Sequence, residues 1–155
     1  MKILAKNKRA FYDFEIIDTL VAGIKLTGHE VKSLKDKGNI QLNGTYVTIH
    51  KGDLYLAHLN IPPYSHASKV SLASYDPERF RKLLVTKKQL AHIAFEKQAK
   101  KLVIIPTKIF IDHNLVKVEI ALAKPLKKYE KKNRRKEREE KLKVQKIKRT
   151  VQTVY

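Results

Sequence analysis

The chain has 155 residues, of which 34 are Lys or Arg and 15 are Asp or Glu, so its formal net charge is +19. This excess is far above what solubility requires and indicates a polyanionic partner. The length favours one hydrophobic core with extensions, the lack of Cys excludes disulfides, and no apolar run reaches the ~20 residues of a membrane span. We therefore expect a cytoplasmic protein.

The positive charge is spread over the whole chain. Residues 124–155 carry 14 basic and 4 acidic side chains, which gives +10. Residues 1–123 carry the other 34 − 14 = 20 basic and 15 − 4 = 11 acidic side chains, which gives +9. A basic tail alone therefore does not explain the charge.

The first predicted elements are a strand and a short helix. Residues 11–22 alternate between apolar and polar side chains, interrupted only by Asp18, which predicts a half-buried strand. Residues 28–37 repeat apolar side chains three apart and precede Gly38, which predicts a helix with a glycine stop.

A hairpin and a loop come next. Residues 45–49 and 54–61 are rich in β-branched and aromatic side chains and flank a turn in which Gly52 can adopt a positive φ. The segment 61–77 is rich in Pro and Ser and has no sustained period, so we expect a long loop.

Two further helices are predicted from their N-terminal signals. Residues 76–84 begin with Asp-Pro, an N-cap followed by a favoured first-turn proline, and would turn Phe80 inward. Residues 86–100 begin with Thr86 and have Gln89 three positions later, the spacing of a capping box.

The last predicted strands, residues 101–111 and 115–123, flank a polar turn at 112–114. Five or six strands with inserted helices in about 120 residues favour a mainly β fold with about three helices. A small closed or partly open β-barrel is the architecture that fits this order of elements.

Catalytic chemistry finds little support. The six histidines do not have metal-ligand spacing, and the sequence holds neither a glycine-rich phosphate loop nor a nucleophile elbow. We expect no enzyme activity, no catalytic residues, no metal and no cofactor.

Two clusters allow both a structural and a binding interpretation. His29 and Glu30 either form a solvated first turn, with the acid at the helix dipole, or offer a carboxylate to RNA base donors. Residues 7–9 with Tyr12 are either a solvated segment beside core aromatics or a contact for unstacked RNA bases. The local pattern leaves both choices open.

The tail is almost entirely charged between residues 127 and 141. Pairs such as Glu137 with Lys141 favour a helix by only about 0.3–0.5 kcal/mol each, and the apolar stripe beyond them is thin. We therefore expect a tail that is disordered alone and folds on a polyanion.

The sequence resembles one family along most of its length, the SsrA-binding proteins, which are bacterial partners of transfer-messenger RNA in ribosome rescue. The resemblance rests on motifs in the family's order: NKRA at 7–10, AGIKLTGHEVKSLK at 22–35, TYV at 45–47, IPPY at 61–64, DPERFRKLL at 76–84, IPTKIF at 105–110 and VKVEIALAKPLKKYEKK at 116–132.

The resemblance implies an oligonucleotide-binding-type (OB-fold-like) closed β-barrel over residues 1–123, and a basic tail over residues 124–155 that becomes helical on the ribosome. It implies a protein that binds the elbow and D-loop of the tRNA-like domain and delivers transfer-messenger RNA to the stalled 70S ribosome for trans-translation. The decoding centre and the empty mRNA channel would be the ribosomal contacts. Elongation factor Tu would be met only through the RNA.

The resemblance also implies which residues bind. The RNA-binding set is Asn7, Lys8, Arg9, Tyr12, His29, Glu30, Lys32, Lys35, Lys124 and Lys127. The tail set for the decoding site and channel is Tyr129, Glu130, Lys131, Lys132, Arg134, Arg135 and Ile147. Pro125-Leu126, Glu130 and Lys132 depart from the family pattern, and the proline predicts a stiffer hinge before the tail.

Two alternatives compete with this interpretation. A structural ribosomal protein would thread its basic tail permanently through ribosomal RNA. A peripheral membrane protein held by the tail is weaker, because the tail lacks aromatic anchors and its apolar stripe is thin.

Overall fold

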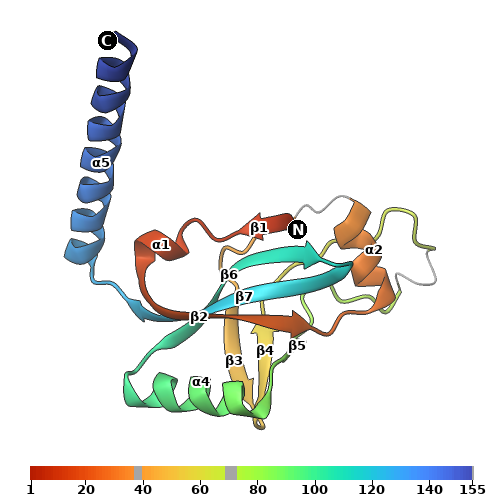
Figure 1. The fold of residues 1–155 in the computed structure, drawn as a ribbon. Coiled ribbons are helices and arrows are strands. Elements are labelled where there is room, and N and C mark those ends of the chain that lie inside the picture. The colour runs from red at the N-terminus through yellow and green to blue at the C-terminus, as the bar shows by residue number, and fades with distance from the viewer. Residues whose placement is uncertain (37–39, 69–72, 155) are drawn as a thin grey trace.

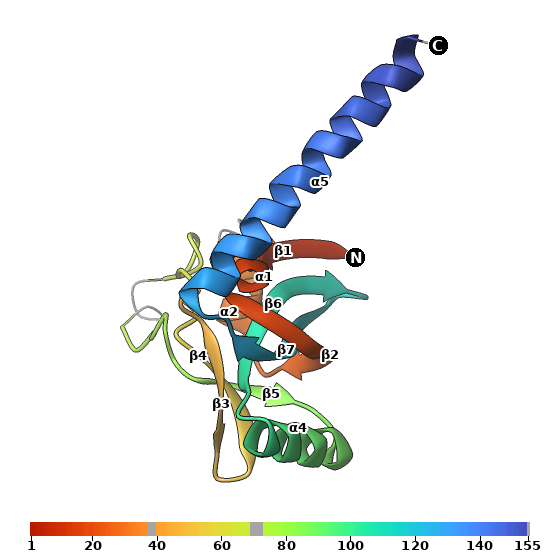
Figure 2. The ribbon, with the colours of Figure 1, turned by 90° about the vertical axis from the view of Figure 1, so that its left-hand side faces the viewer.

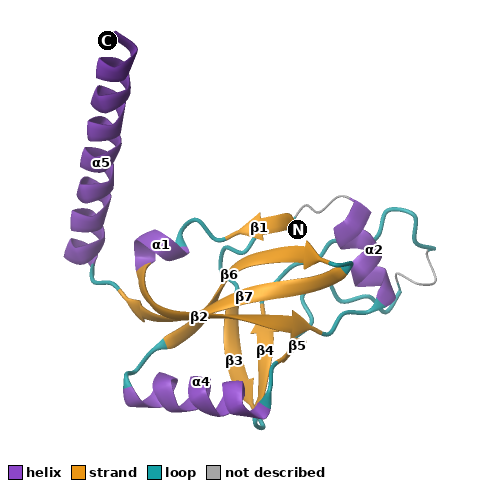
Figure 3. Cartoon of the chain, in the orientation of Figure 1, coloured by secondary structure: helices purple, strands orange, loops and turns teal. Residues whose placement is uncertain are grey.

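The computed structural model describes residues 1–36, 40–68 and 73–154, and shows a mixed α/β fold built on one seven-stranded sheet (Figures 1 and 3). The strands are β1 (Lys2–Lys6), β2 (Phe14–Ile24), β3 (Tyr46–His50), β4 (Asp53–Ala57), β5 (Arg81–Leu84), β6 (Val103–Asp112) and β7 (Leu115–Pro125). The helices are α1 (Ala10–Asp13), α2 (Gly28–Asp36), α4 (Lys87–Ala99) and α5 (Lys128–Val154).

The strand order is β1-β6-β3-β4-β5-β2-β7, and β6 also pairs with β7. Six strands thus form a closed circuit of antiparallel pairs, to which β1 is added along β6. Side chains such as Leu56, Ile104 and Val118, each at most 2% exposed, form one hydrophobic core among these strands. Burial of apolar side chains on β2 to β7 is what holds the body of the protein together.

Several predicted elements are confirmed. The β3–β4 hairpin turns through Lys51 and Gly52, both with positive φ, and the β6–β7 hairpin turns through His113 and Asn114, also with positive φ. The capping box at the start of α4 is complete. Helix α2 covers the predicted range up to Asp36, while the predicted glycine stop at Gly38 lies outside the described residues.

The prediction of one strand over residues 11–22 is wrong at its start. Residues 10–13 form the short helix α1, and β2 begins only at Phe14. The register of β2 against β7 shifts between Ile16 and Asp18. This bulge absorbs the extra residue, which explains why Asp18 breaks the alternation of the sequence.

The predicted helix over residues 76–84 is also wrong. Asp76 instead accepts the backbone N–H of Glu78 at 3.0 Å, an Asx-type turn that uses the same residue preference as an N-cap. Residues 81–84 then form β5, and Phe80 remains 54% exposed. A strand forms here because the side chains of Arg81 and Leu83, two positions apart, both face the interior.

Helix α5 projects away from the strands as a single rod (Figures 1 and 2). Every side chain that the structure describes from Lys132 to Lys146 is exposed. The structure therefore holds the tail in the helical form expected on a polyanion, and its disorder in isolation stays a prediction. Strand β7 continues to Pro125, two residues into the expected tail segment.

Candidate nucleic-acid interface

The first turn of α2 is fixed by a reciprocal cap. The Glu30 carboxylate accepts the Thr27 backbone N–H at 3.0 Å, and the Thr27 hydroxyl accepts the Glu30 N–H at 3.3 Å. This is a capping box of the form Thr-x-x-Glu, and its spacing was visible in the sequence. The box turns the Glu30 side chain toward the body instead of toward solvent.

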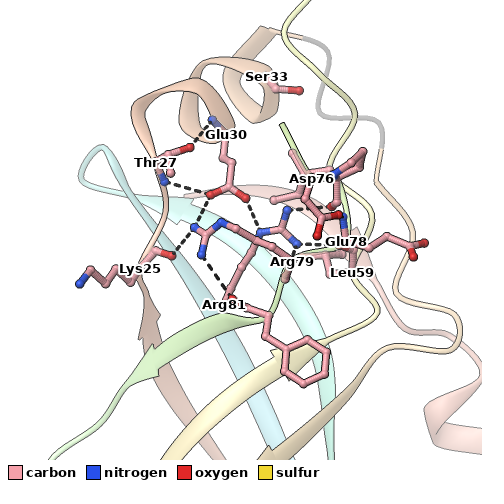
Figure 4. Close-up of polar contacts among 12 residues, drawn as sticks. Lys25, Thr27, Glu30, Ser33, Leu59, Asp76, Glu78, Arg79 and Arg81 are labelled. Atoms are coloured by element: carbon pink, nitrogen blue, oxygen red, sulfur yellow. Dashed lines mark hydrogen bonds and ion pairs between the residues drawn. The ribbon is translucent and has the colours of Figure 1, made fainter. Parts of the chain in front are cut away.

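Two arginines complete the surroundings of this carboxylate (Figure 4). Arg79 pairs with one carboxylate oxygen and Arg81 with the other, and the side chains of Glu30 and Arg81 are fully buried. Arg81 also donates to the carbonyls of Leu59 at 2.6 Å and Pro77 at 2.8 Å. The network thereby joins α2, the segment just after β4 that contains Leu59, and the start of β5.

In this structure the Glu30 side chain lies in the interior, and its predicted contact with RNA stays a prediction. The residue has no exposed surface, and both of its carboxylate oxygens are occupied within the protein. Its position is structural, because a buried carboxylate needs charged partners to offset its loss of hydration.

The ionisation of Glu30 reflects the same contacts. Burial by itself raises the pKa of this carboxyl, but hydrogen bonds from Thr27, Arg79 and Arg81 outweigh burial and hold the pKa below its ordinary value of 4.5. Burial, followed by the nearby Glu30 charge, raises the pKa of the Tyr75 hydroxyl above 10.0. Glu30 is therefore charged at neutral pH and Tyr75 is not.

Asn7 is the second predicted contact that the structure assigns to the interior. Its side-chain amide donates to the Pro106 carbonyl at 3.1 Å, and its side-chain oxygen accepts the Ala10 N–H at 3.2 Å. The residue is only 8% exposed. Asn7 thus fixes the turn between β1 and α1, and its predicted contact with RNA stays a prediction.

The remaining predicted cations and rings form two groups at opposite ends of β2. Lys8, Arg9 and Tyr12 lie at or just before α1, beside the residues that enter the tail. His29, Lys32 and Lys35 belong to α2, beyond the other end of β2. Eleven residues of strand at about 3.3 Å each, or roughly 36 Å of extended chain, separate the two groups.

The base of the tail is attached to α1. The Asp13 carbonyl accepts the Leu126 N–H at 3.0 Å, and the Asp13 carboxylate lies 3.6 Å from the Lys131 ammonium. The Arg138 guanidinium lies 4.6 Å from the centroid of the Tyr12 ring, a cation–π contact. Lys124, Lys127, Lys132 and Arg135 are exposed, while the side chains of Tyr129, Arg134 and Ile147 lie outside the described part of the chain.

Sequence reasoning missed an exposed strip on the outer face of three strands. Gly23 of β2 pairs with Leu84 of β5 on one side and with Lys117 of β7 on the other. Val21 and Leu84 are 47% and 53% exposed although both are aliphatic. Lys82 stands two residues before Leu84 on the same face of β5, and Glu119 of β7 is the partner of Val21, so charges of both signs border this apolar strip.

A side chain in the middle of this outer strip, at Gly23, would crowd the neighbouring strand. A Cβ atom added at Gly23 would lie 3.3 Å from the Cβ of Leu84, tighter than most such contacts. The outer strip, defined as Val21, Gly23, Lys82, Leu84 and Lys117, thus depends on pairing across three strands. Within any single strand, the sequence shows only an aliphatic residue at a position expected to face solvent. That is a weak sign of a surface strip that spans three strands.

Exposed Lys and Arg side chains dominate the surface of the described residues, and no catalytic arrangement stands out among these residues. Within those residues, His, Asp and Glu nowhere gather in a group able to hold a metal ion. Among the described helices, none is both long and apolar enough to cross a membrane. The fold and its surfaces define a class: a small basic protein that binds polyanions.

Comparisons with known proteins specify the class further. The chain belongs to the SsrA-binding protein family, because the family model described as SmpB protein matches residues 4–150. The SsrA-binding protein of Thermosipho melanesiensis is 46% identical over 140 residues, covering 90% of this chain and 92% of the relative. That of Persephonella marina is 42% identical, covering 90% and 89%.

A solved structure described as "tmRNA-SmpB: a journey to the center of the bacterial ribosome" contains a similar chain. It is 39% identical, has a TM-score of 0.63, and the match covers 79% of this chain and 84% of that one. The resemblance read from the sequence motifs is therefore confirmed at the level of the family.

Proposed function

We infer that the protein binds transfer-messenger RNA (tmRNA) and acts with it on the ribosome in trans-translation. The family match over residues 4–150 carries this inference, because it spans both the strands and most of the tail. The charge of +19 supplies the physical requirement, since an RNA partner offers one phosphate per nucleotide. The protein would act as a non-enzymatic RNA carrier, and its place of work would be the cytoplasm.

We propose that the six-strand circuit is a closed barrel of the oligonucleotide-binding type that forms the RNA-binding body. The outer strip is one surface suited to this task. Its lysines can meet phosphates while Val21 and Leu84 contact ribose or an unstacked base, a combination that proteins use on folded RNA. Lys8, Arg9, Tyr12, Lys32, Lys35, Lys124 and Lys127 would extend this binding surface.

The tail would serve the ribosome instead of the tmRNA. Helix α5 exposes cations on all sides over Lys132–Lys146, which suits a channel lined by ribosomal RNA. Tyr129, at the start of α5, would stack on a decoding base, with Glu130 and Lys131 beside it. Arg134, Arg135 and Ile147 would lie farther along the mRNA channel, and elongation factor Tu would be met only through the RNA.

Competition binding tests the proposed function. The dissociation constant for tmRNA is measured across a salt series, with elongator transfer RNA and an equal-length duplex DNA as competitors. Specific binding persists at physiological salt and resists both competitors. If binding falls steeply with salt and is lost equally to each competitor, the protein is a general polyanion binder and the proposed function is wrong.

A charge-reversal pair tests the outer strip. Lys117→Glu lies within the strip, and Lys88→Glu on α4 makes the same change of charge on another exposed surface. We expect Lys117→Glu to weaken tmRNA binding about tenfold and to lower the salt slope by about 1 or more. Equal effects of both variants would contradict a role of the strip.

A further inference from the structure

Helix α4 runs beneath strands β2 and β7 in the view of Figure 1, and a small apolar cavity lies between the helix and the strands. The volume of this cavity is about 110 Å³. Its floor is continuous with the interior of the body, because five of its lining side chains belong to the main hydrophobic core or pack against it: Leu20, Ile93, Ile104, Ile120 and Leu122.

The mouth of the cavity is marked by the exposed members of its lining. The side chains of Asp18 on β2 and His92 on α4 are both more than half exposed, and His92 Nε2 lies 3.4 Å from Asp18 Oδ2. The other Asp18 oxygen accepts the Thr19 backbone N–H at 2.9 Å. Because an exposed pair of this kind contributes little to stability, a partner can move His92 aside with little loss. The core can therefore be reached from solvent at this point.

Two exposed apolar side chains flank the mouth. The register of β2 against β7 passes from Ile16 directly to Asp18, so Ile17 is the extra residue of the bulge, and it is 43% exposed. Phe95 stands one helical turn after His92 on α4 and is 68% exposed. Bulges redirect side chains and are frequent beside functional sites. Apolar side chains grouped at the opening of an apolar cavity are typical of a protein interaction site.

The size and the lining of the cavity limit what can enter it. An apolar cavity of about 150 Å³ admits benzene, so this smaller cavity does not enclose a nucleobase or an aromatic side chain. Its floor consists of aliphatic side chains, which cannot replace the hydration of a phosphate or a ribose hydroxyl. A branched aliphatic side chain has fewer carbon atoms than benzene and suits both the volume and the lining. The fitting occupant is therefore a Leu, Ile or Val side chain of a polypeptide.

The surrounding charge indicates the kind of polypeptide. Residues 87–101, which comprise α4 and the two residues after it, carry five Lys and one Glu, a net charge of +4, and Asp18 lowers the charge near the cavity to +3. A second copy of this chain, at +19, would be repelled. An acidic protein surface would be attracted, because complementary charge speeds encounter and selects the partner.

We propose that this cavity is the anchor point for an acidic protein partner, which places one Leu, Ile or Val side chain between α4 and the bulge of β2. Ile17 and Phe95 contact the partner around this anchor, and the lysines of α4 meet its acidic side chains at the rim. A buried anchor within a polar rim is the usual arrangement of a protein interface. The cavity shares no residue with the outer strip or with the expected RNA-binding set.

Three short acidic peptides test the anchor on the full-length protein. Each consists of Asp and Ser with Leu, Ala or Trp at its centre, and binding is followed through the methyl resonances of Leu20, Ile93 and Leu122. We expect the Leu peptide to shift these resonances and to bind about tenfold more tightly than the Ala peptide. The Trp peptide should bind no more tightly than the Ala peptide, because its ring exceeds the cavity. Equal binding of the Leu and Ala peptides, no binding of the Leu peptide at millimolar concentration, or tightest binding of the Trp peptide would overturn the proposal.

Two further probes test the class of partner. The Leu peptide with Lys in place of every Asp should bind at least tenfold more weakly than the acidic one, and equal binding would contradict the expected acidic partner. A single-stranded hexaribonucleotide should leave the methyl resonances of the cavity unmoved. If it shifts them, the cavity contacts nucleic acid and the proposal is wrong.

Matched variants locate the anchor. His92→Trp places a large ring over the mouth, whereas Ala91→Trp places the same ring at the neighbouring exposed position of α4, outside the lining of the cavity. Both positions are exposed, so neither change disturbs the core. His92→Trp should abolish the difference between the Leu and Ala peptides, and Ala91→Trp should preserve it. The same effect of both variants would count against the cavity as the anchor.

This proposal and the proposed function fail separately. His92→Trp should leave the affinity for tmRNA unchanged, because His92 is not among the expected RNA contacts, and a loss of tmRNA binding in this variant would contradict a protein-docking role. If tmRNA binds specifically but the peptides do not discriminate, the docking site is wrong and the proposed function stands. If the Leu peptide is selected while tmRNA loses to both competitors, the docking site stands and the proposed function is wrong.

Discussion

Helices α2 and α5 both begin with an acidic residue in the first turn and are rich in Lys, yet they exist for different reasons. Helix α2 buries Glu30, Ser33 and Leu34, and its cap is tied to two arginines from elsewhere in the chain. Helix α5 buries none of the side chains that the structure describes. The first helix is maintained by tertiary contacts, and the second by local bonds and contacts at its base.

This difference shows which interactions stabilise the body and which stabilise the tail helix. The body is stabilised by its own core and by ion pairs removed from water. Among the residues that the structure describes, the Leu126–Asp13 hydrogen bond, the Asp13–Lys131 contact and the Tyr12–Arg138 contact join the tail to the body, and the tail sequence adds weak i,i+4 pairs. A partner therefore has to supply most of what keeps the tail helical.

Removal of the tail should separate the two regions most sharply. A chain lacking residues 130–155 keeps the whole strand circuit, so tmRNA binding should change little while tagging in a reconstituted translation reaction is abolished. Affinity and tagging are measured on the same preparation. Loss of both together would show that the tail also serves tmRNA binding.

Breaking the buried ion network should have the next largest effect. Arg81→Ala leaves the Glu30 carboxylate without its fully buried partner, so the free energy of unfolding should fall by about 3–5 kcal/mol. Denaturant titration measures the change. The control is Lys82→Ala, which removes the solvent-exposed ion pair between Lys82 and Asp53 and should lower the free energy of unfolding by less than about 1 kcal/mol. Similar losses in the two variants would contradict the assigned role of Arg81.

The pH dependence of stability should report the same network with a smaller effect. The folded pKa of Glu30 lies below its ordinary value of 4.5, so its contribution is present above that pH and is lost as the pH falls toward the folded pKa. Unfolding titrations between neutral pH and pH values below 4.5 should therefore show a steeper loss for the wild type than for Glu30→Gln. Parallel curves for the two proteins would assign the acid sensitivity to other carboxyls.

The smallest effect is expected at the tail base. Tyr12→Ala removes the ring beneath Arg138, worth about 0.5–1 kcal/mol at an exposed site. Amide exchange in α5 should accelerate a few-fold while the denaturation midpoint of the body stays unchanged. Phe95→Ala, which removes an exposed ring from α4, is the matched control and should leave α5 exchange as it was.

The sequence predicted elements whose signals are local. The Thr86–Gln89 capping box and the alternation of β7 are each complete within a few residues, and both were placed correctly. The Asp76-Pro77 start failed because an N-cap and an Asx turn use the same residue type. A single stretch of sequence does not tell these two outcomes apart.

The site was harder to predict because its residues act across long separations. The bonds that bury Glu30 come from Arg79 and Arg81, about fifty positions away, and the outer strip joins strands from three parts of the chain. Motif resemblance identified the family, but it does not report burial, so it did not indicate that Glu30 and Asn7 lie in the interior. The Thr27–Glu30 capping box was visible in the sequence, but a capping box does not report burial, because Gln89 of the corresponding box at Thr86 is exposed.

The length of α5 has a geometric consequence. Its 27 residues at 1.5 Å each make a rod of about 40 Å, anchored at one end by Asp13. When helical, the tail therefore fixes the distance from the body and the direction of the described side chains between Lys132 and Lys146. One inserted residue would turn the distal half by roughly 100°, whereas seven would lengthen the rod by about 10 Å and nearly restore its facing.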